Sequence, residues 1–366
     1  MAFSLSPTPR IRRTPFSAGV EAHGVKAYSV YNRMLLPTMF ESLEADYHHL
    51  KRHVQLWDVA CQRQVSLHGA DALRLVQLLC PRDMSAMALD QCYYMPMVNR
   101  RGKMLNDPVV VRLAADHFWI SVADGDFWQY ACGVADALDL DVAVEEPDVS
   151  PLAVQGPRAE DLMVRLFGDS ARDIGFFRHR RLSFEGHRFL IARSGYSRQG
   201  GFEIYVDDSA WAMPLWEAFF AAGEDLHLRA GCPNMIERIE GGLLSFGSDM
   251  TSAHTPFEAG LGRYCTSRAD FIGKAALRAA AAPRQMIRPL AIEGRIPPCD
   301  RPWPLLAAGG AGGVVGQVSS AAWSPDFRTN VALAMVAHSH WHAGTKLEVE
   351  THDGMRWATI QARFWL

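Results

Sequence analysis

The segment from Ala192 to Val206 carries the arrangement of residues best suited to chemistry. It predicts a strand, a glycine-flanked polar loop, and a second strand in which large apolar residues alternate with Glu203 and Tyr205. A carboxylate that points inward beside a tyrosine is costly unless it has a fixed partner. Glu203 is therefore a candidate ligand-binding acid. The alternative is a solvent-facing glutamate on a half-exposed strand.

Asp107 marks a second position where an acid could act on a ligand. It follows a strand that begins at Met104, and Pro108 comes directly after it. Because proline cannot donate a hydrogen bond to a sheet ladder, we expect the chain to leave the sheet here. Asp107 and Asn106 are candidate site residues at this strand end. The alternative is that both only stabilise a turn.

Arg238 lies in the segment Glu237-Arg238-Ile239-Glu240, which we interpret as part of a helix. Charged side chains about one helical turn apart commonly form local ion pairs. Arg238 is therefore either a locally paired helix residue or a partner for a buried acid such as Glu203.

Composition excludes several classes of protein. The 366 residues are 49% hydrophobic and 21% charged, which is ordinary for a globular protein of two or three domains. A net charge of −3 gives no electrostatic basis for binding nucleic acid or an anionic membrane. No apolar run approaches the ~20 residues of a membrane span, and the first residues lack the apolar core of a secretory signal. Seven scattered cysteines without a CxxC pair indicate reduced thiols in a cytoplasmic protein.

Two groups of histidines have spacing that a metal site could use. His338, His340 and His342 alternate and would share one face of a strand, but no acidic partner is evident. The histidines of the segment 48–53 have helical spacing but lack the glutamate of a zinc-protease motif, so we interpret them as a polar helix face. The sequence predicts no metal.

The order of the predicted elements favours an α+β fold. Helices are predicted at 40–54, 70–79, 126–138, up to Phe167 and at 210–222, and strands at 56–59, 93–98, 104–113, 118–122, 141–146, 151–155 and within 182–206. Hairpins and helices mix without regular βαβ alternation, which argues against a doubly wound sheet. After about residue 283, glycines and prolines surround short strands at 314–318, 331–336 and 345–350, which indicates a separate β domain, a barrel or jelly-roll.

Several short stretches resemble the glycine-cleavage T-protein (aminomethyltransferase) family. They are Tyr31–Pro37, Trp57–Val59, Gln91–Tyr94, Leu105–Pro108, Ala153–Pro157, Ala192–Val206 and Gly231–Glu240. Ala-Val-Gln-Gly-Pro at 153–157 is shared by the wider family. Cys-Tyr-Tyr, Asn-Asp-Pro and Gly-Cys-Pro-Asn narrow the resemblance to its dimethylsulfoniopropionate demethylase branch. The resemblance runs from about residue 10 to the C-terminus.

The resemblance implies an α+β, three-domain cloverleaf with folate in a central channel and a small C-terminal β-barrel or jelly-roll. We expect a discontinuous folate-binding domain over 1–55 and 145–265, a second α+β domain over 56–144 and a β domain over 283–366. The implied reaction is methyl transfer from dimethylsulfoniopropionate to tetrahydrofolate. The expected binding partners are thus a small onium substrate and folate. A homodimer stays open as the oligomeric state.

The resemblance also assigns roles to the acids. Glu203 becomes the pterin anchor, because two carboxylate oxygens match the adjacent amine and ring N–H of a pterin, and Arg238 lies beside the folate. Hydrogen bonds of this charged kind contribute roughly 1.5–3 kcal/mol each. Asp107, Asn106 and Tyr94 become the catalytic residues. T-proteins have an acidic pair where this chain has Asn106-Asp107.

Tyrosines are candidates for an aromatic cage around the onium cation, with Tyr94 and Tyr205 also near the folate. The four are Tyr31, Tyr94, Tyr196 and Tyr205. Each cation–π contact contributes ~0.5–2 kcal/mol, and the alternative is a core tyrosine whose hydroxyl binds the backbone. Trp57, Phe176 and Phe177 are predicted to lie in the core. The substrate carboxylate needs a cation, and the sequence does not choose among Arg33, Arg193 and Arg198.

Five positions depart from the demethylase branch. The branch has Trp at Tyr196, Lys at Arg198, His at Arg33, Tyr at Phe246 and Asn at Ser248. The change at Tyr196 keeps open another donor, such as glycine betaine, dimethylsulfonioacetate or an aryl methyl ether. The changes at Phe246 and Ser248 keep open a folate-binding protein without turnover.

Overall fold

The computed structural model describes residues 8, 10–309 and 313–366, which form two compact units. Unit 1 consists of residues up to Leu75 together with Ala86–Tyr93 and Pro108–Asn234. Unit 2 consists of Val76–Ser85, Tyr94–Asp107 and Met235–Leu366. The boundaries that we expect for three domains stay a prediction.

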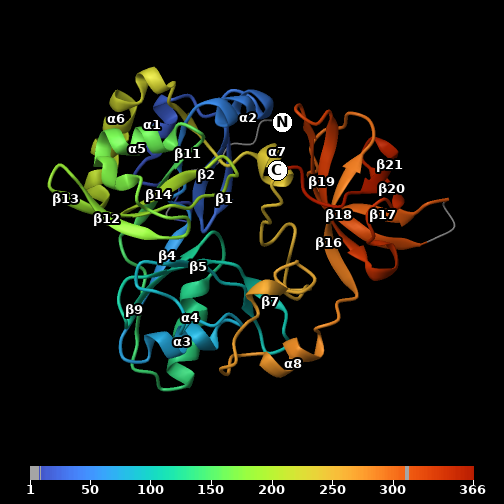
Figure 1. Cartoon of the computed structure of the whole chain (residues 1–366), viewed down its shortest axis with the longest axis horizontal. Helices are drawn as coiled ribbons and strands as arrows, with labels where there is room; N and C mark the ends of the chain where they lie inside the picture. Colours follow the sequence, from blue (N-terminus) through green and yellow to red (C-terminus); the bar gives the residue numbers. More distant parts are fainter. Residues whose placement is uncertain (1–7, 9, 310–312) are drawn as a thin grey trace. The chain divides into compact units, whose positions relative to one another are not determined.

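A six-stranded sheet forms the centre of unit 1 (Figure 1). Its order is β12 (His179–Phe184), β13 (His187–Ala192), β14 (Gly201–Val206), β11 (Ser150–Gln155), β3 (Gln55–Asp58) and β15 (Arg229–Gly231). Only β15 pairs in parallel, with β3. Apolar residues of α1 (Ser17–Ala22), α5 (Ala159–Phe167) and α6 (Ala212–Ala222) cover one face and pack against Phe202 and Ile204 of β14.

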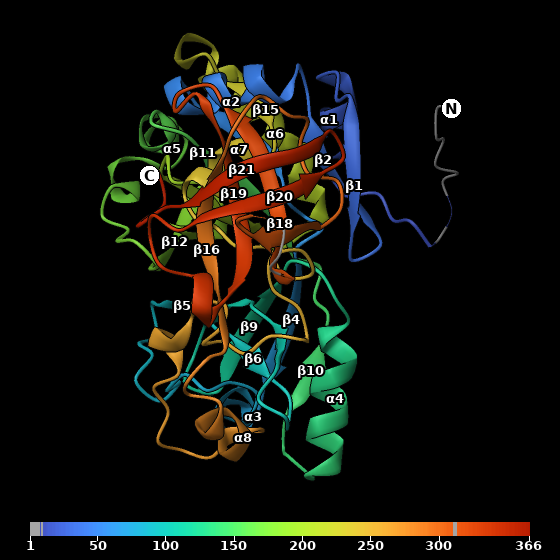
Figure 2. The ribbon, with the colours of Figure 1, turned by 90° about the vertical axis from the view of Figure 1, so that its right-hand side faces the viewer.

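A second, five-stranded sheet belongs to the same unit. Its order is β10 (Ala143–Glu145), β4 (Arg63–His68), β9 (His117–Val122), β8 (Val109–Arg112) and β5 (Cys92–Tyr94), accompanied by α3 (Ala72–Leu78) and α4 (Phe127–Ala137). Trp128 Nε1 of α4 donates to the Val144 carbonyl at 3.1 Å, which holds this helix beside β10 (Figure 2). Trp119 of β9 packs with Tyr205 of β14, so both faces of β14 are buried.

Unit 2 contains a closed barrel, drawn in orange and red in Figure 2. Its order is β16 (Gln285–Ile292), β19 (Thr329–Ala337), β18 (Val314–Ser324), β17 (Trp303–Ala307), β20 (Lys346–Thr351) and β21 (Gly354–Ile360). Leu290, Trp303, Leu305 and Val349 are among the apolar side chains that fill it. The same unit holds the hairpin β6 (Met97–Val98) and β7 (Met104–Asn106), and the helices α7 (Met235–Glu240) and α8 (Lys274–Ala279). The α+β class and the terminal β domain are confirmed, as a barrel.

Two sequence-based expectations about side-chain placement were wrong. Phe176 is 77% exposed, whereas Phe177 packs against the cluster that contains Trp119. The Phe176 ring lies 4.9 Å from the Phe177 ring, measured between centroids. The histidines after Ala337 share no strand face, because β19 ends there and His338–His340 form a 3-10 turn. Trp57, in contrast, is 1% exposed and confirmed as core.

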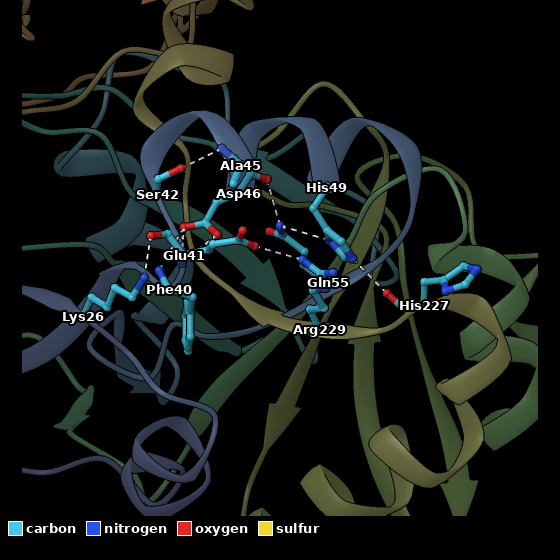
Figure 3. A network of polar contacts seen from close by, with 10 residues as sticks. All are labelled: Lys26, Phe40, Glu41, Ser42, Ala45, Asp46, His49, Gln55, His227 and Arg229. Carbon is cyan, nitrogen blue, oxygen red and sulfur yellow. Dashed lines mark hydrogen bonds and ion pairs between the residues drawn. The ribbon is translucent and has the colours of Figure 1, made fainter.

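The histidines of α2 (Leu43–Arg52) do not form a wholly polar face (Figure 3). His49 is buried, with Nε2 at 2.9 Å from the carbonyl oxygen of His227 and Nδ1 at 3.4 Å from the Gln55 amide. Burial and, next, the charge of Arg229 lower the pKa of His49 to about 4. Because α2 packs on β3 and β15 in this network, His49 points into unit 1 instead of solvent. Among the described residues, no helix combines the length and apolar character needed to cross a membrane.

Candidate active site

Glu203 is buried on the β14 face opposite the helices of unit 1, with 7% of its surface exposed. Ser194 Oγ donates a hydrogen bond to Glu203 Oε2. Burial raises the pKa of Glu203, and the Ser194 hydrogen bond lowers it. The cross-strand neighbours of Glu203 are Ala153 and Ala192, so no large side chain crowds the carboxylate from either strand. The solvent-facing alternative for Glu203 is wrong.

Tyr205 lies on the same face of β14, two residues further along. Its ring packs on Trp119 at 5.9 Å between centroids, and the residue is 1% exposed. Burial and then the charge of Glu203 raise its pKa; Ser121 is near enough to lower it but lies outside hydrogen-bonding geometry. Within the described chain the Tyr205 hydroxyl has no hydrogen-bond partner. A buried hydroxyl of this kind costs about 1–3 kcal/mol, so it fits a place where a ligand supplies the missing partner.

The glycine-flanked loop between β13 and β14 folds around Gln155, which is 1% exposed. Gln155 Nε2 donates to the Ser194 carbonyl at 3.1 Å, and Ser197 Oγ donates to Gln155 Oε1 at 2.8 Å. Gly195 and Gly201 have φ of 151° and 156°, and a Cβ on either would collide with the Gln155 amide. The glycines are therefore required both by backbone conformation and by this close approach.

Sequence reasoning missed Gln155, although it stands inside the Ala153–Pro157 motif. That motif was used only as a marker of the fold. The available signal was a long polar side chain at the end of a predicted buried strand, directly before Gly156. Such an amide needs partners in the interior, and the polar loop residues of 194–201 supply them.

The predicted substrate residues of unit 1 lie on two turns. Tyr196 is half-buried and Arg198 exposed on the loop before β14. Tyr31 ends β1 (Ala27–Tyr31), and Arg33 is exposed on the turn to β2 (Met34–Met39). The neighbouring Asn32 fixes this turn by donating its amide to the carbonyls of Cys61, Val122 and Ala123 at 2.9–3.1 Å.

Arg193 is the third arginine that the sequence offered for a substrate carboxylate. Its Nη2 donates to Glu160 Oε2 at 2.9 Å, and its guanidinium lies 5.3 Å from the centre of the Phe202 ring. These contacts engage Arg193 inside unit 1.

In unit 2 the structure brings Tyr94, Asn106 and Asp107 together. The Tyr94 hydroxyl donates to Asp107 Oδ2 at 2.6 Å, and Asn106 Oδ1 accepts the Asp107 backbone N–H at 2.9 Å. The surrounding protein desolvates Asp107, although the residue keeps some exposed surface. Burial raises its pKa to about 7, with the Tyr94 hydrogen bond lowering it and the charge of Asp249 adding to the rise. Asp107 can therefore exchange a proton near neutral pH.

An aromatic and basic cluster supports Tyr94 from behind. The Tyr264 ring meets the Tyr94 ring edge-on at 5.2 Å. Arg82 Nη1 donates to the Tyr94 carbonyl at 2.8 Å while its guanidinium lies 5.1 Å from the centre of the Tyr264 ring. Phe246, one of the departures from the demethylase branch, packs in the same cluster. Sequence reasoning missed both residues: Tyr264 comes from a segment far from Tyr94 along the chain, and Arg82, although only 12 residues before Tyr94, carries no pattern that indicates the contact.

Arg238 of α7 is tied to the barrel within unit 2. Its Nη1 lies 2.8 Å from Asp249 Oδ2, and its Nη2 donates to Ser320 Oγ at 2.7 Å. Asp249 also accepts the hydroxyls of Ser319 and Ser320 at 2.7 and 2.6 Å. The serines reach Asp249 because β18 has an irregular register between Val318 and Ser320. Sequence reasoning did not single out Asp249.

A metal site does not emerge from these side chains. Within residues 8, 10–309 and 313–366, no group of three or more His, Cys, Asp or Glu side chains is arranged to hold a metal ion. Hydroxyls donate to the two carboxylates, from Ser194 to Glu203 and from Tyr94 to Asp107, and aromatic rings pack beside Tyr94. These groups suit an organic ligand with hydrogen-bond donors.

Two family models match this chain. The model of the GCVT N-terminal domain matches residues 17–268, and that of the glycine cleavage T-protein C-terminal barrel domain matches residues 294–365. The second match covers β17 to β21, five of the six strands of the closed barrel of unit 2. The chain belongs to the glycine-cleavage T-protein, or aminomethyltransferase, family.

Individual relatives narrow the similarity. The chain is 62% identical over 364 residues to the dimethylsulfoniopropionate demethylase DmdA of Ruegeria pomeroyi, covering 99% of each chain. It is 28% identical to an aminomethyltransferase of Alkaliphilus metalliredigens, covering 92% of this chain and 93% of the relative. The solved aminomethyltransferase T of Bartonella henselae superposes with a TM-score of 0.85 at 22% identity, over 97% of this chain and 98% of that one, which shows the T-protein fold.

Proposed function

We propose that this protein is a tetrahydrofolate-dependent methyltransferase that demethylates dimethylsulfoniopropionate. The products are 3-(methylthio)propanoate and 5-methyltetrahydrofolate. The observation that carries the proposal is the 62% identity over 99% of both chains with a dimethylsulfoniopropionate demethylase.

Two buried groups of unit 1 fit a reduced pterin. Glu203 offers acceptor oxygens that alanine neighbours do not cover, and the Tyr205 hydroxyl lacks a partner in the described chain. Glu203 would accept the exocyclic amine and ring N–H of the pterin, and Tyr205 would satisfy its own hydroxyl on the ligand. When bound, tetrahydrofolate supplies the nucleophilic N5 amine. We extend the proposal to Arg238, which would lie beside the folate.

Asp107 is the residue that we propose for charge and proton handling. Transfer forms a nitrogen–carbon bond and breaks a carbon–sulfur bond, whose electron pair leaves with sulfur as a neutral thioether. Positive charge thereby moves from sulfur to N5, and the N5 proton must leave. A carboxylate with a pKa of about 7 stabilises the arriving charge and accepts that proton near neutral pH. Tyr94 and Asn106 hold Asp107 in place.

Tyr196 and Tyr31 are the residues that we propose for the onium group, with Arg33 or Arg198 for its carboxylate. Each ring contributes ~0.5–2 kcal/mol, and fixing both reactants in an in-line geometry can contribute roughly 7–11 kcal/mol. Positioning therefore dominates over cage strength. A tight cage that stabilised only the ground-state sulfonium would slow the reaction.

A panel of methyl donors tests the proposal. The protein is incubated anaerobically with tetrahydrofolate and dimethylsulfoniopropionate, dimethylsulfonioacetate, glycine betaine or an aryl methyl ether. We expect 5-methyltetrahydrofolate to form fastest from dimethylsulfoniopropionate, with an equimolar thioether product. A faster donor without a sulfonium would overturn the substrate. Tight folate binding without transfer from any donor would indicate a folate-binding protein without turnover.

The proposal also places the protein in the cytoplasm, where its thiols stay reduced. It requires small molecules only, with no metal, nucleic acid or membrane. The proposal leaves the oligomeric state open, with a homodimer as one outcome. Light scattering on the purified protein measures the assembly, and metal analysis with chelator treatment of the active enzyme measures any metal requirement.

A further inference from the structure

Gln155 has no group that takes part in methyl transfer, yet it is buried at the centre of the loop before β14. Its amide oxygen binds Ser197, and its amide nitrogen binds the carbonyl of Ser194. Ser194 in turn gives its hydroxyl to Glu203. A continuous hydrogen-bonded path therefore runs from the middle of the loop to the carboxylate.

We propose that Gln155 and Ser194 are positioning residues that hold the Glu203 carboxylate and the loop bearing Tyr196 and Arg198 in one fixed arrangement. This inference rests on the proposed function and deepens it. Ser194 sets the orientation and charge of the group that binds the pterin. Gln155 sets the path of the loop whose side chains face the onium substrate.

The two ends of Ser194 have separate tasks. Its carbonyl accepts from Gln155 and its hydroxyl donates to Glu203, so the residue joins the loop to the strand. A donated hydrogen bond favours the charged form of a carboxylic acid, whereas burial favours the neutral form. The Ser194 hydroxyl thus widens the pH range in which Glu203 is a carboxylate that can accept two donors from a pterin. It also fixes the orientation of the carboxylate through Oε2.

Gly195 and Gly201 let the backbone of the loop approach the Gln155 side chain closely. A side chain on either would strike the Gln155 amide, so the loop can approach Gln155 only where the chain has glycine. The backbone N–H of Gly156 also donates to the Gly200 carbonyl at 3.0 Å. The loop is therefore fastened to the end of β11 at Gln155 and Gly156. Tyr196 and Arg198 lie between these fastening points.

The test compares Ser194→Ala, Ser194→Thr, Ser197→Ala and Gln155→Met with the wild type. Tetrahydrofolate affinity is measured by calorimetry between pH 5.5 and 8.5, and kcat and KM are measured for the sulfonium donor. We expect Ser194→Ala to weaken folate binding about 10-fold at pH 7 and to move the loss of binding at low pH to a higher pH. Ser194→Thr, which keeps the hydroxyl, restores both. Ser197→Ala raises the donor KM about 5-fold and leaves the pH dependence of folate binding unchanged.

Gln155→Met removes both hydrogen bonds at nearly equal size, so both the folate affinity and the donor KM worsen. Ser209→Ala is the matched control, because the Ser209 hydroxyl also donates to a carboxylate of unit 1, Asp148, at 2.6 Å. It should behave like the wild type. Circular dichroism measures whether each variant is folded. If Gln155→Met does not fold, the serine variants alone test the inference.

Folded Ser194→Ala that binds folate with the wild-type affinity and pH dependence overturns the inference and leaves the proposed function standing. A wild type that binds folate but transfers no methyl group overturns the proposed function, while the pH dependence of binding still decides the role of Ser194. Absence of folate binding by the wild type overturns both.

Discussion

Glu203 in unit 1 and Asp107 in unit 2 are two desolvated carboxylates that the protein treats differently. Burial raises the pKa of both, and each accepts a hydroxyl hydrogen bond that lowers it, from Ser194 in one case and Tyr94 in the other. Glu203 sits between two alanines on a strand, whereas Asp107 adjoins a cluster of aromatic rings in which Tyr264 supports Tyr94.

The charge of Asp249 makes a further, smaller difference, because it adds to the rise that burial causes in the pKa of Asp107. A carboxylate flanked by small side chains suits a permanent acceptor of hydrogen bonds from a ligand. A carboxylate whose pKa is about 7 suits proton exchange during a reaction. We therefore propose Glu203 as a binding group and Asp107 as a reacting group, because the neighbours that fold around these two desolvated carboxylates differ.

Replacing Glu203 with alanine breaks the binding side of this comparison and has the largest expected effect. The change removes two charge-assisted hydrogen bonds to the pterin, so folate affinity should fall at least about 100-fold. Calorimetry with tetrahydrofolate measures it, and Ser209→Ala serves as the folded control. Unchanged affinity would refute the anchor role.

Replacing Asp107 with asparagine breaks the reacting side. We expect kcat to fall about 10–100-fold while folate affinity changes little, because the amide keeps the shape of the carboxylate but cannot accept the proton. In the wild type, Asp107 becomes protonated as the pH falls through about 7, so the rate should fall towards lower pH. The pH–rate profile of Asp107→Asn should lack this step. A profile that keeps the step assigns it to another group.

Replacing Tyr94 with phenylalanine sharpens the comparison by removing the hydroxyl that lowers the pKa of Asp107. The acidic limb of the pH–rate profile should then move to higher pH, and kcat at pH 7 should fall about 2–10-fold. Tyr93→Phe is the matched control, because it removes the hydroxyl of the neighbouring tyrosine, which donates to the Ala86 carbonyl at 3.4 Å. An unshifted profile in Tyr94→Phe would contradict the coupling.

His49 separates the stability of the fold from these site effects and should leave activity at pH 7.5 unchanged. Its pKa is about 4 in the folded protein and ~6.5 unfolded, so the unfolded state binds more protons between these values. Stability should therefore decrease as the pH falls from about 6.5 to 4, by roughly 2 kcal/mol after allowance for solvent screening. Urea unfolding of the wild type and His49→Gln measures this, and equal slopes with pH would reject it.

The sequence was most informative where one segment carried its own pattern. In the segment 192–206 the polar loop and the second strand form as predicted, the strand as β14, but β13 ends at Ala192, so the first strand lies before the segment. The strands predicted at 93–98 and 104–113 are each divided in two, and their inner parts, β6 and β7, pair as a hairpin. The alternation of apolar and polar residues in β14 predicted only one buried face. Both faces are buried, because a second layer of residues covers the face of Tyr205, and the pattern cannot reveal that layer. Strands β16, β17 and β21 were missed among the glycine- and proline-rich turns of the barrel.

The contacts among the candidate site residues were only partly predictable, and their roles stay a prediction. Tyr94, Asn106 and Asp107 are close in sequence and meet through a hairpin, so their grouping followed from local order. Tyr264 contacts Tyr94 from a distant segment, and Arg82, although near in sequence, reaches the Tyr94 carbonyl only in the folded chain. Asp249 pairs with Arg238 only because α7 packs beside the β18 bulge.

By itself, the sequence determined the family, the α+β class and the identity of the two acids, because motifs and side-chain chemistry are properties of the chain. Tertiary structure alone decided how each acid is desolvated and which group holds it. That decision depends on residues such as Gln155 and Asp249, whose partners meet them only when strands and loops pack. The shift of a pKa and the formation of a hydrogen bond depend on burial and on the distance between groups. Both burial and these distances are fixed only when the chain is folded.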